Sequence, residues 1–302
     1  AVKTIGLFSP GEMGHSVARV LHQHGLEVVT CLAGRSARTH RLAAEAGVRE
    51  VPSVAEVVRQ ADMVLSIVVP SAAPGVGAEV ARAARETGLR PLFVDANSIA
   101  PSTARGIERA IVQAGGRFVD ASIIGGAEGV ARGRTTFYAS GRDAPEFARL
   151  ASYGLRIEVI GDEVGQASGL KMLNAGLTKG LSALSVELLL LARALGLLDR
   201  LLAKLQADNP EIAAFMQRRL LDLPMHAARR SEEMDELAQA CQELGLPSHM
   251  ALAAQDSLKA IGDLRLRERY GEATLEGWDF PQVLRVLAEG LAAPREASGP
   301  EE

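Results

Sequence analysis

The stretch Ile5–Gly14, which reads IGLFSPGEMG, decides the fold. A short apolar run comes first, and Gly11 and Gly14 then lead into an amphipathic segment. A strand that turns through glycines into a helix brings the backbone close to a pyrophosphate and offers it the free N–H groups of the helix N-terminus. A serine stands where such turns usually have their first glycine. The predicted cofactor turn consists of Ser9, Pro10, Gly11, Glu12, Met13 and Gly14.

The first half of the chain repeats this alternation of strand and helix. Val- and Ile-rich runs bounded by turn residues predict strands at Lys3–Phe8, Leu26–Cys31, Met63–Val69, Pro91–Asp95, Arg117–Ala121, Thr135–Ser140 and Arg156–Ile160. Apolar residues at helical spacing predict helices at Glu12–His24, Ala37–Ala46, Ser53–Gln60, Ala72–Thr87 and Pro101–Ala114. This order predicts an α/β domain over residues 1–162, a Rossmann-type doubly wound and mostly parallel sheet with helices on both faces.

The pattern changes after Gly161. Strand signals cease, and Ala- and Leu-rich segments punctuated by glycine and proline predict helices at Ala167–Gly196, Asp199–Gln206, Ile212–Leu221, Met225–Gly245 and Met250–Arg267. We therefore expect an all-helical domain over residues 163–290, with a helix break at Pro224. Residues 291–302 are polar and contain proline and glycine, which predicts a disordered tail.

Composition sets limits on function. Of 302 residues, 47% are hydrophobic and 23% charged, which is typical of a soluble globular protein and excludes a disordered chain. The formal charge of −4 argues against a general nucleic-acid-binding protein. Two cysteines far apart and scattered histidines predict no metal site and a reducing, cytoplasmic compartment. The most apolar run, Val186–Leu198, contains Glu187 and Arg193 and falls short of a membrane span. Long Leu-rich helices with few aromatic residues predict a homodimer.

The second predicted strand carries information about the cofactor. An NAD site places a carboxylate at the end of this strand to bind the ribose hydroxyls, and none occurs here. Arg35, Ser36 and Arg38 follow instead. Arginine binds phosphate oxygens through two parallel N–H donors, so these residues favour the 2′-phosphate of NADP. The alternative is that both arginines are solvated residues at the start of a helix.

Three motifs in this order resemble the β-hydroxyacid dehydrogenases, the superfamily of 6-phosphogluconate and 3-hydroxyisobutyrate dehydrogenases. Ile5–Gly14 is similar to their cofactor turn, which usually reads G-x-G-x-M-G. Asp120–Ala127 is similar to their substrate segment D-A-P-V-S-G-G, and Gly165–Asn174 to their G-x-G-x-x-x-K-x-x-N. The C-terminal half departs from the well-known members, which places the chain in a divergent and poorly characterised branch.

The resemblance implies roles for residues of the third motif. In the relatives the lysine that matches Lys171 is the general acid/base for the substrate hydroxyl, and the asparagine that matches Asn174 holds the substrate. Their spacing of three places both on one face of a helix. The alternative for Lys171 is a surface position on an amphipathic helix. By analogy with the family, Val69 and Asn97 line the nicotinamide ribose, and Pro70, in the loop after the strand Met63–Val69, is a further predicted cofactor-binding residue.

The substrate segment differs from the family pattern. Ser122 and Ile124 stand where the relatives have proline and serine, while the N–H groups of Gly125 and Gly126 remain available for an anion. Toward the C-terminus, Glu232 and Glu233 occupy the positions of a Lys-Asp pair in the relatives, and Arg229, Arg230 and His226 offer positive charge instead. We expect Ser122, Ile124, Gly125, Gly126, Arg230 and Glu233 to bind substrate. For the charged residues, a solvated helix face is an equal alternative.

These expectations combine into one function. The sequence predicts an NADP-dependent oxidoreductase that transfers a hydride between the nicotinamide and the carbinol or carbonyl carbon of a small, anionic hydroxy acid, with the active site between the domains. An imine reductase, which shares the architecture and commonly lacks the lysine, is one alternative. A catalytically inactive NADP-binding sensor is the other.

Overall fold

The computed structural model describes residues 2–8 and 11–292, and the chain divides into two compact units, Ala1–Met172 and Leu173–Glu302. The division falls within one long helix, α8 (Gln166–Ala194). The sequence-based boundary at residue 162 remains a prediction. The predicted disordered tail lies, from residue 293 onward, outside the described residues.

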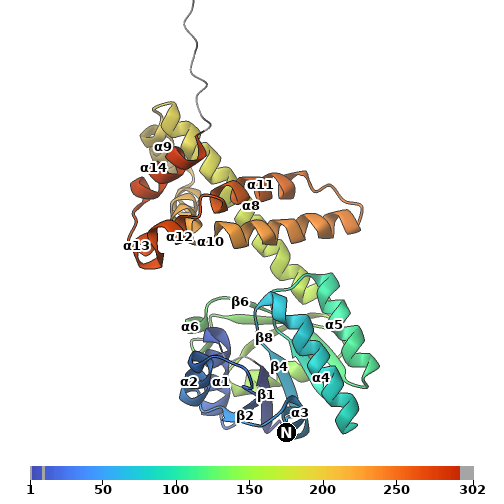
Figure 1. The fold of residues 1–302 in the computed structure, drawn as a ribbon. Helices are drawn as coiled ribbons and strands as arrows, with labels where there is room; N and C mark the ends of the chain where they lie inside the picture. Colours follow the sequence, from blue (N-terminus) through green and yellow to red (C-terminus); the bar gives the residue numbers. More distant parts are fainter. Residues whose placement is uncertain (1, 9–10, 293–302) are drawn as a thin grey trace, which may run out of the picture. The chain divides into compact units, whose positions relative to one another are not determined.

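The first unit is built on an eight-stranded sheet of order β3-β2-β1-β4-β5-β6-β7-β8 (Figure 1). The strands are β1 Thr4–Phe8, β2 Glu27–Thr30, β3 Arg49–Glu50, β4 Met63–Ser66, β5 Leu92–Asp95, β6 Arg117–Ile124, β7 Thr136–Ser140 and β8 Arg156–Gly161. Neighbouring strands are parallel except β6 and β7. The predicted Rossmann-type α/β fold is confirmed.

Helices cover both faces of this sheet. They are α1 Glu12–Gln23, α2 Ala37–Glu45, α3 Val54–Gln60, α4 Ala73–Thr87, α5 Pro101–Gln113, α6 Ala127–Val130 and α7 Ala144–Phe147, with short 3₁₀ turns at Pro70–Ala72 and Ala148–Tyr153. Successive strand residues point to opposite faces, so Ile5 and Leu7 pack with α1 and α2 while Phe8 packs with α3, α4 and α5. Burial on both faces explains why the strands read as continuous apolar runs.

Strand order determines where a ligand binds. The chain runs from β1 outward to β2 and β3, then returns to place β4 on the other side of β1. Ligands of doubly wound sheets bind beyond the carboxyl ends of the strands at this reversal. The turn after β1, which begins α1, lies at that point.

The second unit is helical. Besides the main part of α8 it contains α9 Leu198–Asp208, α10 Pro210–Glu243, α11 His249–Gly262, α12 Leu266–Tyr270, α13 Glu272–Glu276 and α14 Phe280–Leu291. The predicted break at Pro224 is wrong, because α10 continues through this buried proline. Proline removes one backbone hydrogen bond from a helix, and here the packing of α10 against α11 and α14 outweighs that loss.

Helix α8 exposes a long row of leucines. Leu177, Leu181, Leu184, Leu188 and Leu191 follow one another at spacings of four and three, and each is at least 44% exposed. By length and composition α8 also qualifies as a candidate membrane span among the described residues, in contrast to the expectation from its most apolar run, Val186–Leu198. A stripe that repeats every 3.5 residues is the seam along which one helix pairs with another.

Candidate active site

The turn after β1 has the features of a phosphate site. Gly11 is the N-cap of α1, its backbone is extended, and no side chain caps the helix. No atom lies within 4 Å of the place where a Cβ on Gly11 would stand. Gly14 is buried in the first turn of α1, Met13 packs on the core below, and Glu12 is exposed. The open space and uncapped N–H groups fit a pyrophosphate. Ser9 and Pro10 lie outside the described residues.

The turn between β2 and α2 presents the predicted arginines to solvent. Arg35 and Arg38 are exposed, and neither forms an ion pair with a described residue. Ser36 is the N-cap of α2: its hydroxyl accepts a hydrogen bond from the Thr39 N–H at 3.3 Å and forms a second hydrogen bond with the Thr39 hydroxyl at 3.0 Å, in which either hydroxyl can donate. The two guanidinium groups are thus available to a phosphate, while the Ser36 oxygen already has a partner.

The loops after β4 and β5 are tied together by Asn97. Its side-chain oxygen accepts from the Val68 N–H at 2.6 Å, and its side-chain nitrogen donates to the Ser66 hydroxyl at 2.9 Å. Asn97 is only 2% exposed, whereas Val69 is 65% exposed and Pro70 begins a 3₁₀ turn. Val69 and Pro70 are therefore accessible to a ligand, and Asn97 positions the loop that carries them.

Two fully buried carboxylates are cross-strand neighbours at the ends of β5 and β6. Asp95 pairs in register with Asp120. Burial raises the pKa of Asp95 to about 7; the N–H of Asn97 opposes this shift, and the second carboxylate adds to it. One oxygen of Asp95 has no hydrogen-bond partner among the described residues. Asp95 thus titrates near neutral pH inside the sheet.

Asp120 holds the beginning of α8. Its carboxylate accepts hydrogen bonds from the Gly165 N–H at 2.8 Å, the Ser168 N–H at 3.0 Å and the Ser168 hydroxyl at 2.5 Å. Burial raises the pKa of Asp120, and these donors oppose the shift. In the sequence Asp120 is recognisable only as the first residue of the substrate motif. Its role could have been suspected, because an acidic residue within a buried strand needs a partner.

The substrate segment after β6 contains two unlike positions. Ile124 is half-buried and pairs with Thr136 across the antiparallel β6–β7 ladder. Gly125 and Gly126 are exposed; Gly125 has a φ of +132°, and a Cβ on it would stand 2.5 Å from the Thr135 hydroxyl. This conformation requires glycine and leaves the exposed backbone of the segment available to an anion.

Ser122, by contrast, is fully buried. Its hydroxyl donates to the Ala167 carbonyl of α8 at 2.8 Å. The hydroxyl proton is therefore already used, and only the oxygen lone pairs remain for a ligand. Ser122 helps to fix the position of α8.

Lys171 and Asn174 lie on α8, as predicted, one helical turn apart. Lys171 is partly buried and Asn174 is exposed. Lys171 follows Ser168 by three residues, so it stands one turn beyond the residues that Asp120 holds.

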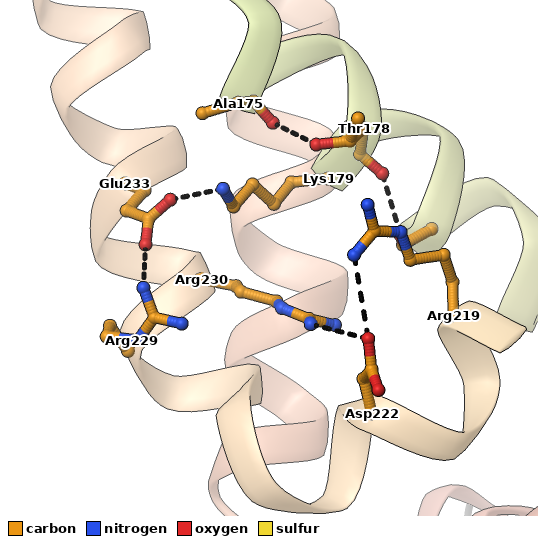
Figure 2. Close-up of polar contacts among 9 residues, drawn as sticks. Ala175, Thr178, Lys179, Arg219, Asp222, Arg229, Arg230 and Glu233 are labelled. Carbon is orange, nitrogen blue, oxygen red and sulfur yellow. Dashed lines mark hydrogen bonds and ion pairs between the residues drawn. The ribbon is translucent and has the colours of Figure 1, made fainter. Parts of the chain in front are cut away.

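A basic cluster lies between α8 and α10 in the second unit (Figure 2). Lys179 and Arg229 both pair with Glu233, each at 2.5 Å. Arg230 is 6% exposed and pairs with Asp222 at 3.2 Å, and Arg219 reaches the same carboxylate at 3.5 Å. Four cations thus surround two carboxylates in this cluster, which sequence reasoning had recognised only through Arg229, Arg230 and Glu233.

Two arginine nitrogens of this cluster lack hydrogen-bond acceptors in the described part of the chain. One terminal nitrogen of Arg230 and the Nε of Arg219 are buried without a hydrogen-bond partner among the described residues. Burial, followed by the neighbouring arginines, lowers the pKa of His226, which disfavours the charged imidazolium. Glu233 is neutralised by its two partners. Arg230 and Arg219 therefore hold the donors that suit an oxyanion.

Among residues 2–8 and 11–292 no group of three or more histidine, cysteine, aspartate or glutamate side chains is arranged to hold a metal ion. The predicted absence of a metal stays a prediction.

Comparison with known proteins agrees with this arrangement. Residues 3–153 match the family described as the NAD binding domain of 6-phosphogluconate dehydrogenase, and residues 192–261 match a domain of unknown function (DUF1932). An uncharacterized 28.5 kDa protein of Methanothermus fervidus is 30% identical over 258 residues, which cover 85% of this chain and 98% of the relative.

Solved structures show the same fold. A conserved protein of unknown function, described as structurally similar to 3-hydroxyacid dehydrogenases, is 37% identical with a TM-score of 0.71 and covers 87% of this chain and 99% of its own. Mycobacterium tuberculosis 3-hydroxyisobutyrate dehydrogenase with L-serine has a TM-score of 0.73 at 21% identity, covering 95% of this chain and 99% of its own.

A more distant likeness has the same extent. An imine reductase variant from Myxococcus stipitatus with NAD⁺ has a TM-score of 0.54 at 19% identity and covers 95% of this chain and 99% of its own. The sheet order, the glycine turn and these matches agree on a nicotinamide-binding oxidoreductase fold. The chain belongs to the 6-phosphogluconate dehydrogenase-like family, as a divergent member of the β-hydroxyacid dehydrogenase superfamily.

Proposed function

We propose that this protein is an NADP-dependent oxidoreductase that transfers a hydride between the nicotinamide and the carbinol or carbonyl carbon of a small hydroxy acid. The observation that carries the proposal is that Lys171 and Asn174 lie one turn apart on α8. The first turn of this helix is fixed to the sheet of the cofactor-binding unit. Lysine is a residue type that serves as a general acid/base, and Lys171 is partly buried on α8.

Lys171 and Asn174 have different roles in the proposed reaction. When bound, the nicotinamide supplies the hydride acceptor or donor. The amine of Lys171 takes the proton of the substrate hydroxyl during oxidation and returns it to the carbonyl oxygen during reduction. The amide of Asn174 hydrogen-bonds the substrate and orients it for this transfer.

The proposed substrate carries an anionic group. The exposed Gly125–Gly126 backbone offers it hydrogen-bond donors at the end of β6, beside the apolar Ile124. In the second unit, Arg230 is proposed as a further oxyanion donor, because one of its nitrogens lacks a hydrogen-bond partner among the described residues. Glu233 contributes by neutralising Lys179 and Arg229. An apolar wall with oxyanion donors fits a small hydroxy acid.

The test is a panel of hydroxy acids and imines assayed with NADP⁺ or NADPH on wild type and Lys171→Met. We expect turnover of at least one hydroxy acid, and a kcat at least about 1,000-fold lower in the variant because general acid–base catalysis is lost. Lys204→Met, which removes a lysine from an exposed pair with Asp208 on α9, is the matched control and retains full activity.

Two other outcomes would replace the proposal. Reduction of imines alone, unaffected by Lys171→Met, supports an imine reductase, the class to which one structural neighbour belongs. Tight NADPH binding with no turnover of any compound supports an NADP sensor.

We also propose that the protein is a cytoplasmic homodimer. The leucine row of α8 and an adjacent cavity of about 300 Å³ between α8, α10 and α11 form a continuous apolar surface of the second unit. Contiguous apolar surface of this kind marks a contact with another protein, and a helix with a repeating leucine stripe suits a second copy of itself.

A further inference from the structure

We propose that Asp120 is a positioning residue for Lys171, because its carboxylate fixes the helical turn that precedes the lysine. The inference rests on the proposed role of Lys171 and adds a residue that acts through it. Asp120 is fully buried and belongs to β6, 51 positions before the lysine in sequence.

The hydrogen bonds around Asp120 converge on one short segment. Three of its four donors come from Gly165 and Ser168. The fourth is the Ser140 hydroxyl of β7 at 3.2 Å, and the oxygen of this hydroxyl also accepts from the Ala167 N–H at 3.0 Å. With the Ser122 hydroxyl on the Ala167 carbonyl, strands β6 and β7 bind both polar backbone groups of that residue. We call Asp120, Ser122 and Ser140 the α8 socket.

The socket replaces an ordinary helix cap. The first N–H groups of a helix have no partner within the helix and carry partial positive charge. At the start of α8 the Asp120 carboxylate accepts from the Gly165 and Ser168 N–H groups and the Ser140 hydroxyl accepts from the Ala167 N–H, so residues of the strands set the position and rotation of the helix against the sheet. A residue three positions beyond Ser168 inherits that rotation, since residues at this spacing share a helix face.

Gly165 makes this approach possible. Its φ of +104° is the region that favours glycine, and a Cβ there would stand 2.6 Å from the Arg105 side chain and 3.2 Å from Pro101. With glycine, the backbone can turn its N–H directly toward Asp120. Gly165 and Asp120 therefore act together to position the helical turn that precedes Lys171.

Two variants separate position from charge. Asp120→Ala removes the acceptor of the Gly165 N–H, the Ser168 N–H and hydroxyl, and the Ser140 hydroxyl. Asp120→Asn keeps an oxygen that faces Gly165 and Ser168 N–H groups, while its NH₂ can donate to the Ser168 hydroxyl, so the position of the turn is retained and the charge is lost. Asp143→Asn, which alters a surface carboxylate paired with Arg117 at 3.3 Å, is the matched control.

The readouts are kcat, KM, NADPH affinity, amide hydrogen exchange of residues 165–171, and acylation of Lys171 as a function of pH. The chain has five lysines, so peptide mapping follows Lys171 with the other four as internal references. For Asp120→Ala we expect kcat to fall about 100-fold, the cost of a 1 Å misplacement of a reacting group. KM and NADPH affinity should stay within threefold, and exchange in the segment should rise at least tenfold.

Asp120→Asn should restore wild-type exchange and keep kcat within tenfold of wild type, and the pH profile of Lys171 acylation should shift in Asp120→Ala only. If Asp120→Ala does not fold, the double variant Ser140→Ala with Ser168→Ala weakens the same attachment and carries the same expectation.

The proposal is overturned if Asp120→Ala, or the double variant in its place, matches wild type in both exchange and kcat. It is also overturned if Asp120→Asn is as slow as Asp120→Ala while its exchange is normal, because charge and not position would then matter. A wild type without turnover contradicts the proposed function instead. In that case exchange and Lys171 acylation still decide whether Asp120 places the lysine.

Discussion

Asp95 is the residue whose environment departs most from its ordinary chemistry. Its side chain is fully buried, one oxygen accepts the Asn97 N–H at 3.0 Å, and the other oxygen has no partner within the described chain. Ionisation there costs solvation that no cation replaces, which raises its pKa to about 7. A proton on Asp95 is therefore part of the folded state below neutral pH.

This proton makes stability depend on pH. Between about pH 4 and pH 7 the folded state keeps a proton that the unfolded state releases, so the free energy of unfolding falls as pH rises through this window. We expect Asp95→Asn to remove about 3 kcal/mol of this decline between pH 5 and pH 8, measured by urea unfolding at these two pH values. Asp120 contributes in the same direction, so a smaller slope persists.

Asp143→Asn is the control, and its slope should equal that of wild type. Equal slopes for wild type and Asp95→Asn would show that Asp95 is ionised throughout the range.

At the scale of elements, we expect the turn that joins β2 to α2 to determine the choice between NADP and NAD. It ends in Ser36, which caps α2 by accepting a hydrogen bond from the Thr39 N–H. Arg35 and Arg38 flank this cap, and neither forms an ion pair with a described carboxylate. A 2′-phosphate would therefore meet two guanidinium groups that have no other ionic partner.

Arg35→Ala combined with Arg38→Ala should weaken NADPH binding by about 10- to 100-fold, the loss of two charge-assisted contacts, and change NADH binding less than threefold. Titration of cofactor fluorescence measures both affinities. Arg85→Ala, an exposed arginine in the last turn of α4, is the control. Equal weakening of NADPH and NADH would contradict a phosphate contact.

The elements that the sequence predicted well are those with an apolar signature. Strands such as β1 and β5 were found because both faces are buried, and α1 and α5 because one face is. Strand β3 was missed because it consists of two exposed charged residues, Arg49 and Glu50. The break at Pro224 failed because the packing of a helix outweighs one missing hydrogen bond, which local sequence cannot reveal.

Site residues were predictable by type and place, but their partners were not. The glycine turn and Lys171 follow from spacing and resemblance. That Ser122 bonds to Ala167, and Asn97 to Val68, depends on contacts between segments 45 and 29 residues apart. Asp120 was missed for the same reason, since its donors belong to a helix that begins far along the chain.

At the scale of the whole molecule, the exposed apolar surface of α8 is the feature that other described residues leave uncovered. In the second unit this helix places leucines at a repeating spacing beside a cavity lined by residues such as Met234 and Met250. Leaving such surface in water is unfavourable by about 25 cal/mol per Å². A second copy would cover it.

Leu181→Glu combined with Leu188→Glu should convert a dimer into monomers, because four carboxylates would then lie along the proposed seam. Sedimentation velocity at micromolar concentration measures the change. Leu89→Glu, at a 42% exposed leucine of the cofactor-binding unit, should leave the dimer intact. A wild type that sediments as a monomer would refute the homodimer.

The continuity of α8 also restricts how this sequence can change in evolution. Each residue added to an α-helix turns everything after it by about 100° and moves it by about 1.5 Å. A single insertion between Leu181 and Leu184 would therefore turn Leu184, Leu188 and Leu191 away from the face that Leu177 and Leu181 share, whereas the loops between other elements can absorb one. Substitutions can accumulate along this part of α8, but homologues should align through the leucine row without gaps.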